Sequence, residues 1–386
     1  MADYTTIDDS SAHFQILTYT GDSSSTTTAD RSLTNDGNSD LQPDIVWIAN
    51  RDTGVNSGLR WWDSSRGVGQ NKGLTTSGSN LEGSPNDPEY GYVNTLSSDG
   101  FGVRAGANDG NGRWTTDRGE GGGDRYVAWQ WKVGGGTTSS NTDGNITTTL
   151  QTNSTAGISI GTYTGAGSSP DNKTIGHGLG AIPDLVLIKG RDGNGLGGAA
   201  QYWMVGAPNL PAFGNGNNNH TFLDTTNALM SNSTVWRSAN FTTSTIPLGG
   251  HAALNGNGAA YVFYAFKNVQ GFSKVGQYTG NDNTDGAFIY TGFKPRFVMT
   301  RGTHVSQWRI YDTKRKPENP NNFRLFPYTN SSEQYDSDAT MDIVSNGFKC
   351  REGGGDLNSG GLNYFYIAFA ENPFVTSTGI PALAGQ

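Results

Sequence analysis

The sequence predicts an all-β protein built from three tandem antiparallel β-sandwich repeats. Its 386 residues include 56 Gly and 11% aromatic residues but only 16% charged residues, a composition typical of strands joined by many loops. Apolar side chains recur with a period of two, and no stretch keeps a helical period over three turns. Five sequence landmarks also recur three times in the same order, which indicates an internal repeat.

The landmarks follow one another along each repeat. The first is a Tyr-Thr-Gly sequence, at residues 18–22, 162–166 and 277–281. The second is an apolar strand after a proline, such as "QPDIVWIANRDTG", at residues 42–54, 182–194 and 294–306. An aromatic strand, at residues 59–67, 201–209 and 307–315, and a turn followed by Phe come next. A closing aromatic strand ends each repeat, at residues 126–132, 261–267 and 364–370.

The closing strands show the alternation most clearly. One face of each strand carries aromatic and β-branched side chains, which are Val127, Trp129 and Trp131, then Val262, Tyr264 and Phe266, then Phe365, Ile367 and Phe369. Because such a face needs cover, the repeat is expected to form two packed sheets. A propeller blade of about 40–50 residues or a β-helix coil of about 20 is too short to explain the observed period.

The repeats set the expected domain bounds. They predict sandwiches over residues 1–133, 158–268 and 269–373. Residues 134–157 are rich in Gly, Ser, Thr and Asn, which predicts a flexible linker. A tail without charged residues follows at 374–386.

Charge and cysteine content exclude several classes of protein. The net charge is −8 and no basic cluster stands out, so nucleic acid is not an expected partner. The single cysteine, Cys350, allows no internal disulfide. No signal peptide and no run of about 18 apolar residues are present, so we expect synthesis in the cytoplasm and no membrane insertion.

No motif indicates an enzyme or a bound cofactor. "TIGHGLG" at 174–180 precedes a strand instead of opening a helix, so a structural turn is expected and not a phosphate site. The segment Asn281–Gly286 resembles part of a calcium loop, but Gly292 stands where an EF-hand needs Glu. Ordinary turn chemistry is expected there, with a weak surface Ca²⁺ site as the alternative. The five histidines are scattered, so no metal site and no catalytic residue is predicted.

Aromatic residues in the Gly- and Asn-rich loops are the candidate ligand-binding residues. They are Tyr90, Tyr92, Trp114 and Trp236. A flat ring beside Asn and Asp groups suits the apolar face of a sugar, so a glycan is the expected ligand. The alternative is that these rings hold long loops against the domain or pack against a partner subunit.

In combination, the motifs resemble those of a family of marine and freshwater bacteriophage virion proteins. The matching motifs are 44–52, 63–67, 98–101, 126–132, 141–146, 163–189 and 366–374. The family is described as tail-fibre-like, and the resemblance implies lectin-like or jelly-roll sandwiches without a catalytic set. It also implies location in the virion, assembled in host cytoplasm. Arg296, where the other repeats have Asp, is a departure from the repeat pattern.

Three functional hypotheses follow. The first is a virion structural protein, a tail fibre or receptor-binding component that contacts host surface glycans and other virion proteins. The second is a decoration protein of the capsid or collar, and the third is a glycan-degrading tail enzyme. Fibres are commonly homotrimers, whereas three repeats in one chain could form a pseudo-threefold within a monomer; from the sequence, both arrangements stay open.

Overall fold

The computed structural model describes residues 4–21, 30–52, 58–84, 87–107, 114–116, 123–167, 173–194, 202–337 and 340–380. Strands and loops make up nearly all of this part of the chain, which confirms the all-β prediction. Its helices are single turns: η1 (Ser10–Ala12), α1 (Asp87–Tyr90), α2 (Ser233–Trp236), α3 (Ala252–Asn255) and α4 (Gly355–Asn358). None of these described helices has the length and apolarity to cross a membrane.

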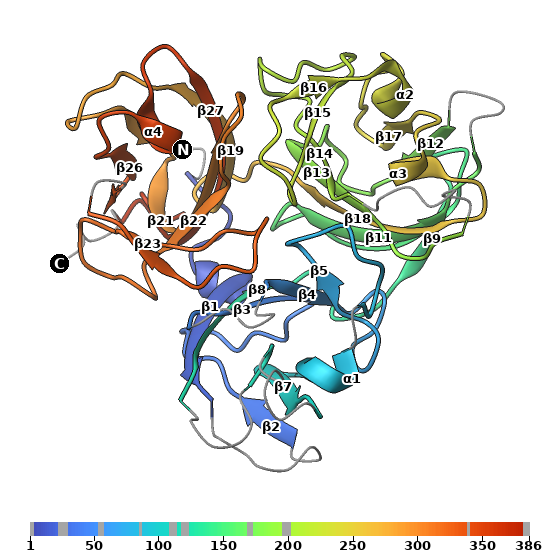
Figure 1. Cartoon of the computed structure of the whole chain (residues 1–386), viewed down its shortest axis with the longest axis horizontal. Coiled ribbons are helices and arrows are strands. Elements are labelled where there is room, and N and C mark those ends of the chain that lie inside the picture. The colour runs from blue at the N-terminus through green and yellow to red at the C-terminus, as the bar shows by residue number, and fades with distance from the viewer. Residues whose placement is uncertain are drawn as a thin grey trace.

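Three units, here defined as residues 4–133, 134–268 and 269–373, form three lobes (Figure 1). The larger sheet of the first unit has the order β1 (Phe14–Thr20), β8 (Arg125–Trp131), β3 (Ile45–Asn50), β4 (Arg60–Asp63) and β5 (Leu74–Thr75). A smaller sheet, β2 (Asp30–Leu33), β7 (Gly100–Ala105) and β6 (Gly91–Ser97), packs on it. Leu17 and Val46 from one sheet share a buried core with Phe101 and Val103 from the other.

The second unit has the largest sheet. Its order is β16 (Met230–Ser231), β15 (Asn219–Phe222), β14 (Met204–Gly206), β13 (Leu185–Gly190), β18 (Ala260–Phe266), β11 (Ile158–Thr164), β10 (Thr148–Asn153) and β9 (Ser139–Asn141). A two-stranded sheet, β12 (Lys173–Gly176) and β17 (Thr245–Leu248), covers one face through a core that includes Ile175, Val186 and Ile246.

The third unit repeats the arrangement. Its larger sheet has the order β19 (Ser273–Thr279), β27 (Asn363–Pro373), β21 (Phe293–Gly302) and β22 (Arg309–Asp312). The smaller sheet has the order β20 (Phe288–Tyr290), β26 (Gly347–Cys350) and β25 (Met341–Val344). A separate hairpin joins β23 (Phe323–Arg324) to β24 (Gln334–Tyr335). The domain bounds expected from the sequence stay predictions, but each unit contains two facing sheets.

The segment expected as a flexible linker, residues 134–157, carries two of these strands. Within it, β10 pairs with β11 and β9 pairs with β10. Ile146 and Leu150 are buried in the core of the second unit. Burial of these two side chains therefore outweighs the low strand propensity of the surrounding Gly, Ser and Asn residues.

A core shared by all three units fills the centre of the molecule. The Phe369 ring lies 5.1 Å from Phe14 of the first unit and 5.9 Å from Phe266 of the second, between ring centroids. The central strands of each larger sheet are thus buried on both faces. In the first unit, Trp129 lies toward the centre and Tyr126 toward the smaller sheet. A space of about 20 Å³ at the centre is lined by apolar side chains. One chain therefore supplies the threefold-like arrangement that the sequence left open, and association with further copies stays a prediction.

The repeated Tyr-Thr-Gly landmark has a structural explanation. Its tyrosine stacks on the first tyrosine of the closing strand in every unit. The pairs are Tyr19 with Tyr126, Tyr163 with Tyr261 and Tyr278 with Tyr364, and their ring centroids lie 5.0, 5.0 and 5.1 Å apart. This landmark is therefore a packing feature of each unit.

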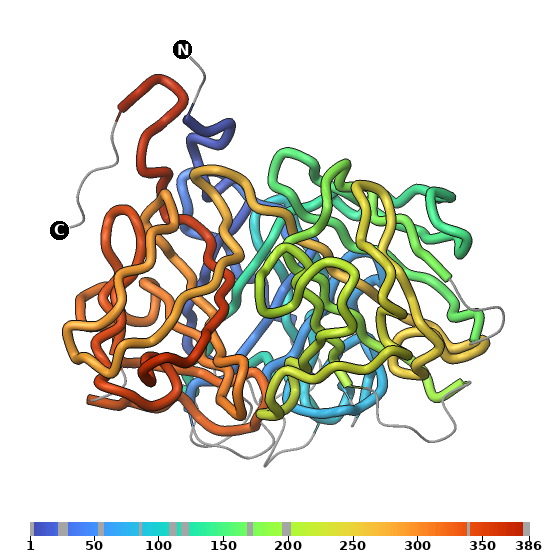
Figure 2. The backbone as a smooth tube through the Cα atoms, turned by 90° about the horizontal axis from the view of Figure 1, so that it is seen from above, coloured from blue at the N-terminus to red at the C-terminus, as the bar shows by residue number. Residues whose placement is uncertain are grey.

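Segments near the two ends of the chain lie side by side (Figure 2). The Asp8 carboxylate accepts a hydrogen bond from the backbone N–H of Ser377, at 2.7 Å. Thr5 donates its hydroxyl to the carbonyl of Gln270, at 2.8 Å. The first and third units are therefore in contact near this side of the molecule.

Candidate functional site

The boundary between the first and second units contains a chain of ion pairs. Arg66 pairs with Asp63 at 2.6 Å and with Glu82 at 2.8 Å, and Glu82 reaches Arg191 of the second unit at 2.8 Å. Tyr264, also from the second unit, donates its hydroxyl to Asp63 at 2.5 Å. Burial and the neighbouring Asp63 carboxylate raise the pKa of Tyr264, so its hydroxyl stays protonated and available as a donor.

The boundary between the third and first units contains an equivalent chain. Arg315 pairs with Asp312 at 2.5 Å and with Glu333 at 2.8 Å, and Glu333 reaches Arg51 of the first unit at 2.8 Å. The indole N–H of Trp129 donates to Asp312 at 3.1 Å, in the role that Tyr264 has at the other boundary. Two of the three boundaries therefore share one design.

The boundary between the second and third units departs from this design. Apolar Ala207 follows β14 at the position that Asp63 and Asp312 hold at the ends of β4 and β22. Phe213 packs edge-on against Phe365, with ring centroids 5.1 Å apart. A groove lies beside this boundary.

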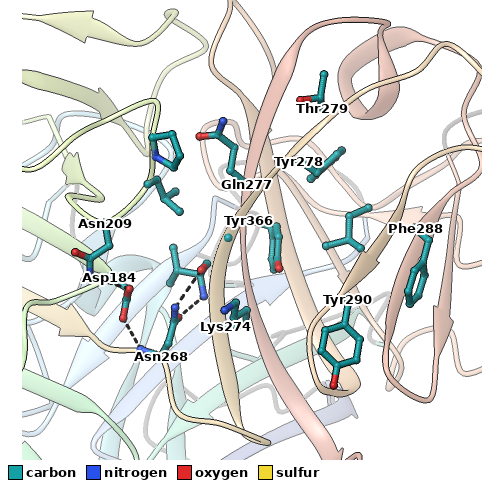
Figure 3. Close-up of a pocket in the computed structure, with 15 residues that line it drawn as sticks. Asp184, Asn209, Asn268, Lys274, Gln277, Tyr278, Thr279, Phe288, Tyr290 and Tyr366 are labelled. Carbon is teal, nitrogen blue, oxygen red and sulfur yellow. Dashed lines mark hydrogen bonds between the residues drawn. The ribbon is translucent and has the colours of Figure 1, made fainter.

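The groove has a volume of about 570 Å³, which is within the usual range for ligand sites. Figure 3 shows Asp184 and Asn209 on one side and Phe288 and Tyr290 on the other, with Tyr366 between them. The second unit thus supplies one wall, and the third unit supplies the other through β19, β20 and β27. The site therefore lies at the boundary whose contacts differ from those of the other two boundaries.

The polar groups of the groove come from both units. Asp184 accepts hydrogen bonds from the side chain of Asn209, at 2.9 Å, and from the backbone N–H of Asn268, at 2.6 Å. Lys274 and the Gln277 amide lie on β19. Burial raises the pKa of the Tyr366 phenol, which therefore stays uncharged. The groove can offer donors and acceptors to a polyhydroxylated ligand.

Two exposed aromatic rings give the groove its apolar surface. Phe288 is 51% exposed and Tyr290 is 55% exposed, whereas Ile289 between them is buried. Side chains at alternate positions of a strand lie on the same face, so both rings lie on the outer face of β20. The Tyr290 hydroxyl also lies 3.3 Å from that of Tyr4. Sequence reasoning missed this pair, although the Phe-Ile-Tyr alternation was a usable signal.

The outer edge of β19 forms the floor of the groove. In the second unit, the equivalent strand β11 is paired along this edge by β10. In the third unit, the side chain of Asn268 takes part of that role, since it accepts from the N–H of Val275 at 2.6 Å and donates to its carbonyl at 3.2 Å. The groove therefore occupies space that a strand fills in the second unit.

The loop aromatics predicted as glycan-binding residues lie elsewhere. Trp114 and Trp236 are each 1% exposed and Tyr92 is 4% exposed, so their faces are not free to stack on a sugar and that prediction is corrected. Tyr90 is half-buried and stacks on Trp114 at 4.6 Å. Packing of these rings within their units, in line with the alternative considered from the sequence, accounts for their burial. Residues 108–113 and 117–122, beside Trp114, lie outside the described residues.

The candidate calcium segment Asn281–Gly286 is occupied by internal contacts. Asp285 pairs with Lys349 and Arg351, each at 2.6 Å, and the Asn283 side chain accepts from the backbone N–H of Asp285. Within the described part of the chain, no three His, Cys, Asp or Glu side chains gather in a way that could hold a metal ion. His177 of "TIGHGLG" is fully buried, and burial lowers its pKa.

A buried charged cluster lies at the boundary between the second and third units. Arg301 of the third unit donates to the carbonyl of Phe222 at 2.7 Å and interacts with Asp224. Burial raises the pKa of Asp224 to about 6 and lowers the pKa of Lys189 to about 8. Asp224 is only 8% exposed and Lys189 and Arg301 are fully buried, so these groups have little access to a ligand.

Comparison with known proteins places the chain in a family. Residues 9–373 match the family described as "Domain of unknown function (DUF7483)". The chain belongs to the DUF7483 family. No curated protein matches this DUF7483 chain. A solved structure described as "Crystal Structure of the STIV MCP" is 9% identical, with a TM-score of 0.16, and the match covers 60% of this chain and 90% of that one. A likeness at this TM-score carries no argument about fold or function.

Proposed function

We propose that this protein is a bacteriophage virion structural protein, a tail-fibre or receptor-binding component that contacts host surface glycans. The observation that carries the proposal is the groove between the second and third units, which has the exposed rings of Phe288 and Tyr290 on one wall and Asp184 on the other. The motif resemblance to phage virion proteins supports the virion part of the proposal. Partners in this role are other virion proteins and host polysaccharide.

The chemistry of the groove suits a saccharide. The apolar face of a pyranose packs on an aromatic ring, and its hydroxyls need donors and acceptors at the rim. Phe288 and Tyr290 supply the rings, and the Gln277 amide and the lysine at position 274 supply hydrogen bonds. The tyrosine phenol adds a polar edge to one ring.

Binding is favoured over hydrolysis. A glycosidase uses two carboxyl groups held at a fixed separation across the bond that is cleaved. The groove is lined by a single carboxylate, Asp184, among the residues described, and both of its oxygens accept hydrogen bonds from neighbouring groups. We therefore assign the groove a recognition role.

A glycan array probed with the full chain tests the proposal. Phe288→Ala with Tyr290→Ala should lower the retained signal at least tenfold. Tyr335→Ala is the matched control, because Tyr335 is 66% exposed in the same unit but does not line the groove. Absence of binding to every glycan, or equal loss in the control, would count against the receptor role.

Imaging of labelled intact particles tests the location. Label on a tail fibre supports the proposal. Label spread over the capsid or collar would instead favour a decoration role, the alternative considered from the sequence.

A further inference from the structure

A second pocket adjoins the groove. It has a volume of about 440 Å³ and is lined by Thr6, Ser154, Thr155, Lys267, Asn268 and Val269. Asn268 lines both spaces, so the two form neighbouring compartments with one shared wall. We infer that an acidic polysaccharide runs across both, with Lys274 in the groove and Lys267 in the second pocket facing its anionic groups. This inference rests on the proposed glycan-binding function and specifies its ligand.

The wall between the compartments is fixed. The backbone N–H of Asn268 donates to Asp184 at 2.6 Å, and its side chain makes two hydrogen bonds to the main chain of Val275. These contacts hold the Asn268 side chain against Val275, and further polar groups lie on both sides of the wall. The hydroxyls of Thr6 and Ser154 and the two lysines are the groups available.

Lys267 and Lys274 differ in their surroundings from the lysines that form ion pairs. Lys294, Lys314 and Lys316 each pair with a carboxylate within 3.3 Å. Among the described residues, no carboxylate lies within ion-pair distance of Lys267 or Lys274, although both are half-buried. One lysine without an ion-pair partner therefore lines each of the two adjoining compartments.

The local positive charge of the two lysines is opposite in sign to the net charge of the chain. The net charge is −8, so an anionic ligand would be repelled by the molecule as a whole unless the contact region offered cations. The one carboxylate of the groove, Asp184, is engaged by two donors from Asn209 and Asn268. Local positive charge beside aromatic rings indicates a sugar polymer that bears carboxylate or sulfate groups.

The path also suits a polymer more than a single sugar. The rings of Phe288 and Tyr290 lie in the groove, whereas Lys267 lies in the second compartment beyond Asn268. One monosaccharide that stacks on the rings would leave the second compartment empty. A chain with repeated anionic groups can occupy both compartments at once.

Calorimetric titration of the full chain tests the inference. The probes are polygalacturonate oligosaccharides, their fully methyl-esterified forms, which keep the backbone and lose the charge, and a sulfated oligosaccharide. The acidic probe should bind, weaken as salt rises, and lose roughly two- to fivefold in affinity with Lys274→Gln or with Lys267→Gln. Lys132→Gln is the matched control, because Lys132 follows the closing strand of the first unit as Lys267 follows that of the second.

The outcomes separate the inference from the proposed function. Binding of the sulfated and carboxylated probes, with lysine dependence in both, supports the inference, and their ratio identifies the preferred anion. If the esterified probe binds equally and only Phe288→Ala with Tyr290→Ala weakens it, the acidic ligand is overturned and the glycan-binding function stands. If Lys132→Gln weakens binding as much as the other lysine variants, the probe is held by nonspecific attraction to surface charge, and the proposed ligand path is overturned. If none of these three probes binds, the acidic ligand is overturned, and the glycan array alone decides the proposed glycan-binding function.

Discussion

Arg51 and Glu333 form an ion pair of 2.8 Å that joins the first unit of the chain to the third. Arg191 and Glu82 make the same contact, at the same distance, between the second unit and the first. In both cases the glutamate also pairs with a buried arginine of its own unit, Arg315 or Arg66. Equivalent residues thus form equivalent ion pairs at two of the boundaries between units. The third boundary, between the second and third units, lacks these ion pairs and borders the groove.

Glu333→Gln should destabilise the protein by about 3 kcal/mol. The glutamate side chain is 2% exposed, and its loss removes the counter-charge that it gives to Arg51 and leaves Arg315 with Asp312 as its ion-pair partner. Urea unfolding followed by tryptophan fluorescence measures the change. Glu318→Gln is the control, because Glu318 pairs with Lys316 at the surface of the molecule. This variant should lose less than about 0.5 kcal/mol of stability. Equal midpoints for Glu333→Gln and wild type would show that the boundary does not depend on this pair.

Phe369→Ala should lower the stability of all three units together. The ring contacts Phe14, Trp131 and Phe266, which come from two other units, and its truncation should cost about 3–5 kcal/mol. Hydrogen exchange should show faster exchange in β1, β18 and β27 alike. Phe348→Ala, in the core of the third unit, should affect that unit first. Loss of protection confined to the third unit in Phe369→Ala would contradict a shared core.

A small residue and a large one exchange places between units. Gly161 lies opposite Phe263 in the second unit, whereas Leu17 lies opposite Ala128 at the equivalent positions of the first. Because a Cβ on Gly161 would clash with the Phe263 ring, Gly161→Ala should cost about 1–3 kcal/mol.

Combining Gly161→Leu with Phe263→Ala copies the first unit and should cost less than the two single changes added together. A double-mutant cycle in urea gives the coupling energy, expected to be about 0.5–3 kcal/mol. Strictly additive losses would mean that the two side chains do not share space.

Asp224 should make stability depend on pH between about 4 and 6. Its folded pKa is raised to about 6 from 3.8, so the folded state binds a proton more readily than the unfolded state in this window. Stability therefore falls as pH rises from about 4 to about 6, by at most about 3 kcal/mol from this group. Asp224→Asn should remove this contribution to the pH dependence. The free energy of unfolding of wild type and variant, measured against pH, should therefore differ in slope between about pH 4 and 6. Parallel curves would assign the pH dependence to other groups.

The strands and the all-β class were predictable because they depend on the local alternation of apolar and polar side chains. The arrangement of the units was not, because Trp129 and Asp312 meet only through tertiary packing. The local composition of residues 134–157 predicts a flexible linker, whereas the structure has two strands there. Leu150 in this segment is buried by tertiary packing, which residue propensities do not take into account.

The candidate site escaped prediction for a related reason. The Gly- and Asn-rich sequence around Trp114 and Trp236 predicts exposed rings, yet both rings are buried. Phe288 and Tyr290 lie in a strand, the kind of element assumed to fill a core. Their exposure follows from β20 being the edge of its sheet beside a boundary between units, and neither fact is local in sequence.

The contact between Trp129 and Asp312 spans 183 residues of chain, which has a consequence for biosynthesis. Translation proceeds at about 5–20 residues per second. The face of the first unit that carries Trp129 is therefore made roughly 10–40 s before the segment that contains Asp312. During that time large apolar rings are open to solvent and to other nascent chains. The yield of folded protein should therefore depend on chaperone capacity and on translation speed.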